Sequence, residues 1–331
     1  MMKNKNGDLL NVKGVCRFLK ENDNYVILAH ASPDGDTLGC AAALCMGLRN
    51  FGKKSFIMCS DTIPEKYSYF FSKDLLEPIE YNTVVAVDIA TEKLLGNLED
   101  TFSGKVDLCI DHHISNTRYA KKLYLDSGAA AACESVYDII KAMKWRLTDR
   151  QAAALYTGIS TDTGSFKYSS VTAKTHKIAA ELYSYNINAH NIAKLMFDTK
   201  SKQFLELERM ILAKSEFFFE DKCFVLSVTS DMLSATGCTE SELESIASIS
   251  RCVEGVIAGV TIKQKAEKLF KISLRTYEPL DASKICMALG GGGHRAAAGC
   301  TLEGSLEEVK EKILKVIKDS LEESNAGISA Y

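Results

Sequence analysis

Three side chains that commonly bind metal ions lie within seven positions near the start of the chain. His30, Asp34 and Asp36 belong to the stretch HASPDGDTLGC. Asp36 could cap the first turn of a following helix, but capping does not account for His30 and Asp34. Two neighbouring carboxylates repel each other unless a cation lies between them. The stretch therefore indicates a cation site.

The same residue types recur where other apolar runs end. Asp88 follows the apolar run of VVAVDIA, and Asp111, His112 and His113 end VDLCIDHH. A carboxylate at the end of an apolar strand is costly to bury unless it is paired or bound to a metal. Asp162, in YTGISTDTGSF, is surrounded by small residues that leave room for a ligand. Helix capping explains one of these positions but not all of them together.

The mixture of imidazole and carboxylate ligands limits which metal ions the site would bind. Such a set favours manganese, zinc or iron over calcium, which prefers oxygen ligands alone. Six such ligands with one shared carboxylate would hold two ions. Two divalent ions a few ångströms apart are typical of phosphoryl hydrolysis, in which they activate a water, hold the phosphate and neutralise developing charge. The residues alone therefore predict a two-metal hydrolytic site.

These side chains need elements that bring them to one place. From about residue 24 to 115, short β-branched runs alternate with helical segments, the pattern of a mostly parallel sheet with helices on its faces. The runs are YVILAH, KSFIMCS, TVVAVDIA and VDLCIDHH. In open α/β sheets, ligands bind at the carboxyl ends of the strands, where these polar residues lie. Residues 131–200 are then expected to be helical.

The C-terminal part has a different pattern. The stretches EFFFEDKCFVLSV and GVIAGVTIKQKAEKLFKISLRTY resemble hairpins, and capping boxes open two helices at Thr239 and Ser305. We expect two α/β domains, an N-terminal one built on a mostly parallel sheet flanked by helices and a smaller C-terminal one. The expected boundaries are 1–200 for a catalytic domain, 201–214 for a helical linker and 215–331 for a substrate-binding domain.

Composition excludes several classes of protein. The formal net charge of −3 argues against general basicity that would grip long nucleic acid. No apolar run reaches the length of a membrane span, and the N-terminal stretch lacks the apolar segment of a signal peptide, so we expect a cytoplasmic protein. The eleven cysteines are scattered and never form a C-x-x-C pair, which predicts reduced thiols and argues against a disulfide framework or a cysteine zinc site.

Five stretches resemble, in order, the motifs of the DHH phosphoesterases. HASPDGDTLGC, the strand that ends in Asp88, DHHISN and YTGISTDTGSF match the four motifs of the catalytic domain. GGGGHRAAAG, residues 290–299, is similar to the signature of the first type of C-terminal domain associated with that family. The resemblance covers nearly the whole chain. It is closest to the short stand-alone members, which cleave oligoribonucleotides and 3′-phosphoadenosine 5′-phosphate.

The resemblance implies a role for each residue of the predicted centre. The implied ligands are His30 and Asp34 at one ion, Asp36, His112 and Asp162 at the other, and Asp88 at both. Asp111 would orient a ligand histidine, and His113 would touch the scissile phosphate or protonate the leaving oxygen. The implied cofactor is two divalent ions, with manganese preferred.

The glycine-rich signature and two arginines would hold the far part of the substrate. Four consecutive glycines leave backbone N–H groups open to a phosphate or a base. The implied substrate-binding residues are Arg251, Arg275, Gly291, Gly292, Gly293, His294 and Arg295. The arginines could instead form surface ion pairs, and the glycines could form a tight turn. The expected partner is a short RNA oligonucleotide or a small nucleotide, because a domain that clamps the far end limits substrate length.

Three other functions stay open at this point. A phosphodiesterase for linear or cyclic dinucleotides, such as pApA or cyclic di-AMP, would use the same residues. A manganese inorganic pyrophosphatase carries a different C-terminal domain, so the glycine signature argues against it. A catalytically silent nucleotide sensor would have no physical need for six metal ligands. The sequence leaves open whether the protein forms a homodimer.

Overall fold

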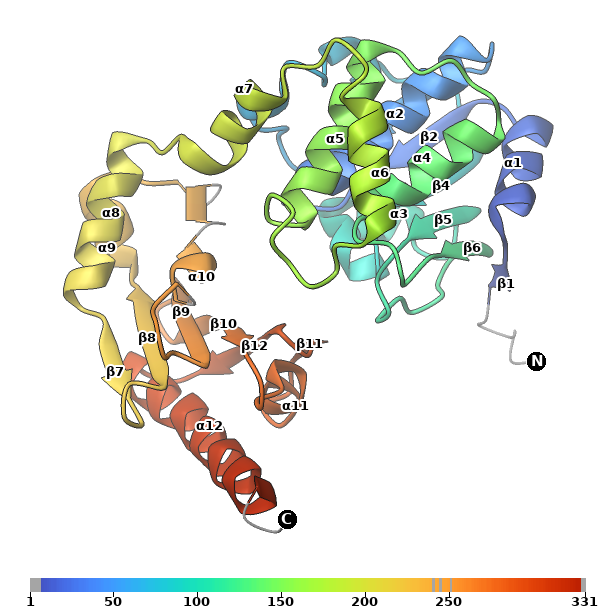
Figure 1. Ribbon diagram of the computed structural model, residues 1–331. Helices are drawn as coiled ribbons and strands as arrows, with labels where there is room; N and C mark the ends of the chain where they lie inside the picture. The colour runs from blue at the N-terminus through green and yellow to red at the C-terminus, as the bar shows by residue number, and fades with distance from the viewer. Residues whose placement is uncertain (1–6, 240–241, 244–245, 251, 329–331) are drawn as a thin grey trace. The chain divides into compact units, whose positions relative to one another are not determined.

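The chain folds into two compact units, Met1–Thr199 and Lys200–Tyr331. The computed structural model describes residues 7–239, 242–243, 246–250 and 252–328. Each unit is built around its own six-stranded sheet (Figure 1). This arrangement confirms the predicted pair of α/β domains. The predicted substrate residue Arg251 lies outside the described residues.

All strand pairs described in the first sheet are parallel, as predicted. In spatial order the strands are β1 (Asp8–Leu9), β6 (Lys122–Leu125), β5 (Leu108–Asp111), β4 (Thr83–Val87), β2 (Tyr25–Leu28) and β3 (Ser55–Met58). The inner strands are buried on both faces, which explains their continuous apolar sequence. Their shared direction places the carboxyl ends of β2, β4 and β5 at one edge.

Helices cover both faces of the first sheet. One face packs against α1 (Val12–Glu21), α2 (Gly35–Asn50), α4 (Ala132–Ala142) and α5 (Asp149–Asp162). The other face packs against the 3₁₀ segment Glu92–Leu98 and α3 (Glu99–Phe102). The remaining helices of the unit are the 3₁₀ turns Glu65–Tyr67 and Lys73–Leu76, α6 (Ala173–Leu182), α7 (Ala189–Ala193) and the π-helical turn Lys194–Asp198.

Small residues let α2 and α5 approach closely. A Cβ added at Gly39 would lie 2.5 Å from the carbonyl oxygen of Ala154, so only glycine fits at this crossing. The first turn of α2 carries Asp36, and the last residue of α5 is Asp162. The close packing therefore fixes the end of one helix beside the start of the other, next to the sheet edge.

The second sheet is mixed. In spatial order its strands are β11 (Gly292–His294), β12 (Ala297–Glu303), β10 (Leu269–Thr276), β9 (Ala258–Ala266), β8 (Cys223–Val228) and β7 (Glu216–Phe218). Antiparallel pairing of β7 with β8 and of β9 with β10 confirms the two predicted hairpins. Strands β8 and β9 pair in parallel, and α9 (Ser230–Thr236) and α10 (Ile246–Ile249) lie in the connection between them.

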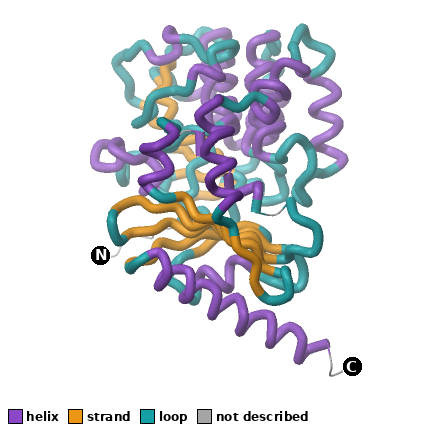
Figure 2. The backbone as a smooth tube through the Cα atoms, turned by 90° about the vertical axis from the view of Figure 1, so that its left-hand side faces the viewer, coloured by secondary structure: helices purple, strands orange, loops and turns teal. Residues whose placement is uncertain are grey.

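Each face of the second sheet has its own helical cover. Helices α11 (Ala282–Met287) and α12 (Leu306–Ile328) pack on one face, along which the long C-terminal helix runs (Figure 2). Helix α8 (Lys202–Ala213) packs with α9 against the other face of β8. The predicted capping box at the start of α12 is confirmed, because Ser305 N–H donates to Glu308 at 2.7 Å and Glu308 N–H donates to Ser305 Oγ at 3.3 Å. Among the described helices, none combines the length and apolar character needed to cross a membrane.

Candidate metal centre

The structure brings the six predicted metal ligands together at the carboxyl edge of the first sheet. Two groups of these residues have ligand atoms within 4.8 Å of one another, His30 with Asp34 and Asp88, and Asp36 with His112 and Asp162. Asp88 and His112 also form such a group with His113. Asp88 faces both groups: its Oδ2 lies 3.7 Å from His30 Nε2, and its Oδ1 lies 3.6 Å from His112 Nε2. In the second group, His112 Nε2 lies 3.4 Å from Asp162 Oδ2. One buried carboxylate is therefore placed between two sets of nitrogen and oxygen donors.

In His30 and His112, Nδ1 lies near a backbone carbonyl oxygen, and Nε2 faces the carboxylates of the centre. His112 Nδ1 lies 3.2 Å from the Ala129 carbonyl oxygen, and His30 Nδ1 lies 2.8 Å from that of Ala31. An N–H at Nδ1 leaves a lone pair on Nε2, the form in which histidine binds metals. Within the described part of the chain, His112 Nε2 and Asp88 Oδ1 are buried atoms without a hydrogen-bond partner. Both atoms can donate a lone pair and they face each other, so a divalent cation between them would bind to both.

The aspartates of the centre lie close together, and their negative charges favour a bound cation. Burial raises the pKa of Asp88 well above the usual aspartate range, and the charges of Asp36 and Asp34 raise it further. The same causes raise the pKa of Asp162. Burial opposes a charge on His30, but the hydrogen bond to Asp34 and the charge of that carboxylate outweigh burial and raise the pKa of the imidazole. A bound cation would relieve this repulsion.

Two helix N-termini orient the aspartates of the first motif. Asp34 caps α2, where its Oδ1 accepts from the N–H groups of Asp36 at 3.0 Å and Thr37 at 3.1 Å. Asp36 accepts from the start of α4: Ala132 N–H donates to Oδ2 at 2.6 Å and Cys133 N–H to Oδ1 at 2.9 Å. Sequence reasoning missed this second contact, because the N-terminus of α4 lies far from Asp36 along the chain. Both carboxylates are thus held in place before any ion binds.

The backbone at Asp88 is unusual. Its φ of 57° lies in the left-handed region, which aspartate and asparagine tolerate better than most residues. Its N–H donates to the Ile110 carbonyl at 2.9 Å. Thr37, which sequence reasoning also missed, joins the neighbouring segments: its hydroxyl donates to Val87 O at 3.1 Å and accepts from His30 N–H at 3.3 Å. These bonds turn the Asp88 carboxylate toward the histidines.

Asp111 holds the histidine beside the centre. Its side chain is fully buried, and its Oδ1 lies 2.8 Å from His113 Nδ1. Asn116 Nδ2 donates to the other carboxylate oxygen at 2.6 Å and to Ile89 O at 3.4 Å. Burial opposes ionisation, but the hydrogen bonds and charge from His113 and the bond from Asn116 lower the pKa of Asp111. Asn116 was not singled out from the sequence, although it stands within DHHISN.

Replacing Asn116 by alanine should destabilise the N-terminal unit. The change leaves a buried Asp111 oxygen without its donor, which costs about 1–3 kcal/mol of unfolding free energy. Urea unfolding of the variant, compared with Asn186→Ala at an exposed position, measures the loss. Equal stability of the two variants would show that Asn116 does not support Asp111.

Of the predicted substrate residues of the second unit, Gly291 and Gly292 line a common hollow. A hollow of about 400 Å³ is lined by Lys271, Gly290, Gly291, Gly292, Gly299, Cys300 and Thr301. Gly293 lies beside it in β11 with a φ of 145°, and a Cβ there would lie 2.5 Å from the Ala298 Cα. Glycine is therefore required at that position for backbone reasons. Lys271, a cation in the hollow, was not predicted as a site residue.

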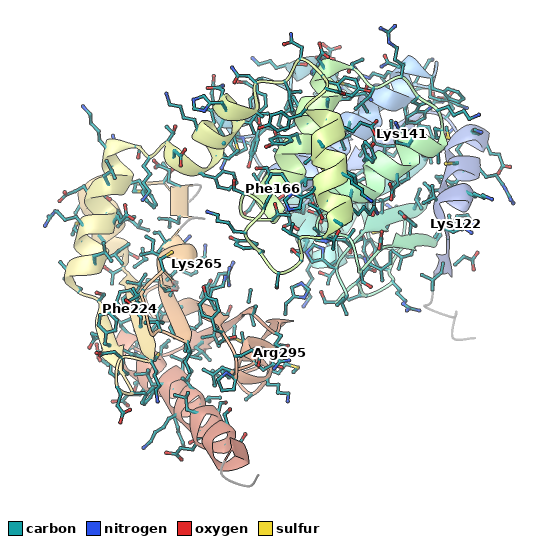
Figure 3. All side chains as sticks on the ribbon, in the orientation of Figure 1. Lys122, Lys141, Phe166, Phe224, Lys265 and Arg295 are labelled. Atoms are coloured by element: carbon teal, nitrogen blue, oxygen red, sulfur yellow. The ribbon has the colours of Figure 1, made fainter. Side chains whose placement is uncertain are left out.

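The basic side chains near the glycines have different surroundings. Arg295 is exposed (Figure 3), and its Nη2 lies 2.7 Å from Glu278 Oε2, so this residue forms a surface ion pair. Arg275 lies half-buried on β10, where its Nη1 donates to the Leu274 carbonyl at 3.1 Å. His294 ends β11 with an exposed side chain. The hollow does not include these three side chains among its lining residues.

Comparisons with known proteins identify both units. Residues 24–159 match the model described as DHH family, N-terminal domain, and residues 221–323 match the DHHA1 domain. A protein of Thermus thermophilus named bifunctional oligoribonuclease and PAP phosphatase NrnA is 29% identical over 93% of each chain.

Solved structures show the same fold. An exopolyphosphatase-related protein from Bacteroides fragilis has a TM-score of 0.83 at 23% identity, covering 94% of this chain and 95% of its own. RecJ from Thermus thermophilus, solved in complex with Mn²⁺, has a TM-score of 0.54 at 13% identity, covering 93% of this chain and 55% of its own. The two domain matches, together with the ordered motifs, confirm the resemblance: the chain contains a DHH domain at residues 24–159, followed by a DHHA1 domain at residues 221–323.

Proposed function

We propose that this protein is a two-metal phosphoesterase that hydrolyses short oligoribonucleotides and 3′-phosphoadenosine 5′-phosphate. The observation that carries the proposal is the position of Asp88 between two groups of histidine and aspartate donors. The substrate class is supported by the similarity, over nearly the full length, to a protein named for oligoribonuclease and PAP phosphatase activity.

Six residues would hold the ions. They are His30 and Asp34 at one site, Asp36, His112 and Asp162 at the other, and Asp88 at both. The ions would activate a water, hold the phosphate and neutralise developing charge. Manganese is proposed because the donors mix imidazole with carboxylate, and because a protein of similar fold, RecJ, has been solved with Mn²⁺.

The remaining residues of the centre would orient the substrate and move a proton. Asp111 fixes the His113 ring through Nδ1, which leaves Nε2 as the nitrogen that would reach a phosphate or a leaving oxygen. Asp111 stays ionised, because its pKa is lowered, and so remains an acceptor for an N–H at His113 Nδ1. We assign to His113 the role of contacting the scissile phosphate or donating a proton to the leaving oxygen. The N–H groups at the start of α4 hold Asp36 while charge builds on the phosphate.

The second unit would bind the part of the substrate remote from the reaction. The proposal assigns catalysis to residues 1–200, a helical linker to 201–214 and substrate binding to 215–331. The glycine hollow offers backbone N–H groups and the Lys271 ammonium, which suit a phosphate. The proposed substrate-binding residues are Arg251, Arg275, Gly291, Gly292, Gly293, His294 and Arg295, to which the hollow adds Lys271.

Metal removal and a substrate panel test the proposal. Protein treated with a chelator should lose hydrolysis of pApA and 3′-phosphoadenosine 5′-phosphate, and Mn²⁺ should restore it better than Mg²⁺. The panel also contains cyclic di-AMP and pyrophosphate, which report the alternative activities. Full-rate hydrolysis by chelated protein would end the two-metal proposal, and activity on pyrophosphate alone would end the nucleotide assignment.

A further inference from the structure

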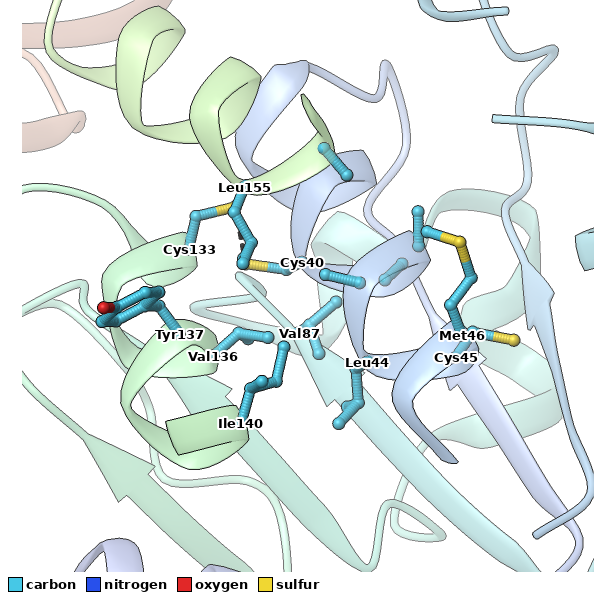
Figure 4. Close-up of a cluster of buried hydrophobic side chains, with 14 of the residues drawn as sticks. Cys40, Leu44, Cys45, Met46, Val87, Cys133, Val136, Tyr137, Ile140 and Leu155 are labelled. Atoms are coloured by element: carbon cyan, nitrogen blue, oxygen red, sulfur yellow. Dashed lines mark hydrogen bonds between the residues drawn. The ribbon is translucent and has the colours of Figure 1, made fainter. Parts of the chain in front are cut away.

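Two cysteines lie directly behind one of the candidate ligands. Cys40, on α2, and Cys133, at the start of α4, are both fully buried, and their sulfur atoms lie 3.4 Å apart (Figure 4). Cys40 Sγ lies 3.7 Å from Asp36 Oδ1, and one potential ligand atom from each of the three side chains lies within 4.8 Å of the others. All described cysteines are free thiols, as predicted. Asp36, Cys40 and Cys133 form this thiol cluster, and its two thiols have no role in the proposed hydrolysis.

Two separations within the thiol cluster lie within about 0.4 Å of the edges of a tetrahedral thiolate site. Bond lengths of about 2.3 Å to sulfur and 2.1 Å to oxygen give tetrahedral edges of about 3.8 Å between sulfurs and 3.6 Å between sulfur and oxygen. The observed edges are 3.4 Å for Cys40 Sγ to Cys133 Sγ and 3.7 Å for Cys40 Sγ to Asp36 Oδ1. Three protein ligands leave the fourth position to a water. The donor set therefore suits a thiophilic divalent ion.

Two neighbouring glycines leave room for the Cys133 sulfur and for Asp36 Oδ1. A Cβ at Gly39 would lie 2.9 Å from Cys133 Sγ, and a Cβ at Gly158 would lie 2.9 Å from Asp36 Oδ1. Any larger residue at either position would push a ligand atom away. The donors are thus held close together by the same packing of α2 that places Asp36 at the metal centre.

The two oxygens of Asp36 face different partners. Oδ2 lies 3.9 Å from His112 Nε2, in the candidate metal centre, whereas Oδ1 lies toward Cys40. One carboxylate can bridge two ions through its separate oxygens. An ion at the thiol cluster would therefore draw electron density from the same carboxylate that serves the centre, and would weaken binding there.

We propose that Cys40, Cys133 and the Oδ1 atom of Asp36 form a separate site for a thiophilic divalent ion such as Zn²⁺ or Cd²⁺, which lowers the affinity of the neighbouring centre for Mn²⁺. As the ion binds, each thiol loses its proton to solvent and each sulfur replaces a water on the ion. The cysteines are far apart in the sequence, so a search for C-x-x-C spacing does not find this site.

Titration of the metal-free full-length protein with Cd²⁺ tests the site without any substrate. The wild type should develop the ultraviolet sulfur-to-cadmium charge-transfer band. Cys40→Ser and Cys133→Ser, which keep the size of the side chain, should lose that band and weaken Cd²⁺ binding by at least about tenfold. Cys45→Ser is the matched control, because Cys45 is a buried cysteine of the same helix whose sulfur contacts Ser55.

Two further measurements decide the outcome. Mn²⁺ affinity, followed by the electron paramagnetic resonance of free Mn²⁺, should fall when Cd²⁺ is added to the wild type but not to Cys40→Ser. Cys286→Ser reports binding at the other thiol pair, because Cys286 is hydrogen-bonded to Cys300. Circular dichroism verifies that each variant is folded. An unchanged band in folded Cys40→Ser and Cys133→Ser, with the band lost in Cys286→Ser, would overturn the proposal.

Discussion

Replacing Asp88 by asparagine is expected to abolish hydrolysis and, at the same time, to stabilise the metal-free protein. Activity should fall by at least about 10⁴-fold, the scale on which loss of one member of a catalytic unit acts. The reason is that Asp88 faces both groups of candidate ligands, so its loss should affect both ions. The rate with Mn²⁺ and a nucleotide substrate measures the first effect.

The stabilisation follows from the raised pKa of Asp88. Burial and the neighbouring carboxylates raise that pKa above its value in the unfolded chain. The metal-free wild type should therefore lose stability as the pH rises above the ordinary aspartate pKa, because the unfolded chain ionises first. Asparagine cannot ionise, so Asp88→Asn should make the metal-free protein more stable than the wild type at neutral pH, where ionisation of Asp88 stabilises the unfolded wild-type chain.

Asparagine is the informative substitution at position 88 because it tolerates the left-handed backbone conformation of Asp88. Alanine at a φ of 57° would add strain of its own, whereas asparagine tolerates the left-handed region as aspartate does. Thermal unfolding without metal and with Mn²⁺ measures stability, and Asp100→Asn, at an exposed position, is the control. The wild type should gain stability from Mn²⁺ and Asp88→Asn should gain little. A Mn²⁺-dependent gain as large as that of the wild type would contradict the bridging role.

The sequence predicts where the candidate ligands lie when they directly follow apolar strands. Burial on both faces makes β2, β4 and β5 continuous apolar runs, so the polar residue that follows each strand stands out. Parallel strands then bring those residues to one sheet edge, and no contact distant in sequence has to be guessed. The positions of His30, Asp88 and His112 could be expected for this reason.

The parts that sequence reasoning missed depend on contacts between distant segments. Strand β1 has two residues and joins the sheet only by pairing with β6, so neither periodicity nor propensity indicates it. The N–H groups that hold Asp36 come from the start of α4, which carries no side-chain signal for that contact. The sequence predicts the strand of Lys271 as one strand of a hairpin. The pairing of β10 with β12, which the sequence does not indicate, brings Lys271 to the glycines.

Replacing Arg275 by alanine should lower kcat/KM for long substrates much more than for short ones. We expect kcat/KM for pApA or a short RNA to fall by about 30-fold, equivalent to about 2 kcal/mol, because a charge-assisted contact to phosphate is lost. Hydrolysis of a small chromogenic phosphodiester should barely change, since binding energy from a remote group is available only to a substrate that reaches it.

The position of Arg275 in the second sheet supports this expectation. Lys271 and Arg275 are four residues apart on β10, so their side chains leave the same face of the strand, about 13 Å apart along it. The residues between and beside them on the other face are buried against α11 and α12. The basic pair therefore lies on the face that carries the glycine hollow.

Two control variants make the comparison specific. Arg275→Lys keeps the charge but loses the planar fork, so it should recover part of the lost kcat/KM on the long substrate. Lys318→Ala removes a positive charge from α12, where the lysine faces Glu322, and should change neither substrate. Equal losses on long and short substrates for Arg275→Ala would mean that the arginine supports the fold or the metal centre. Because the small diester reports the metal centre alone, this pattern separates a substrate clamp from a structural role.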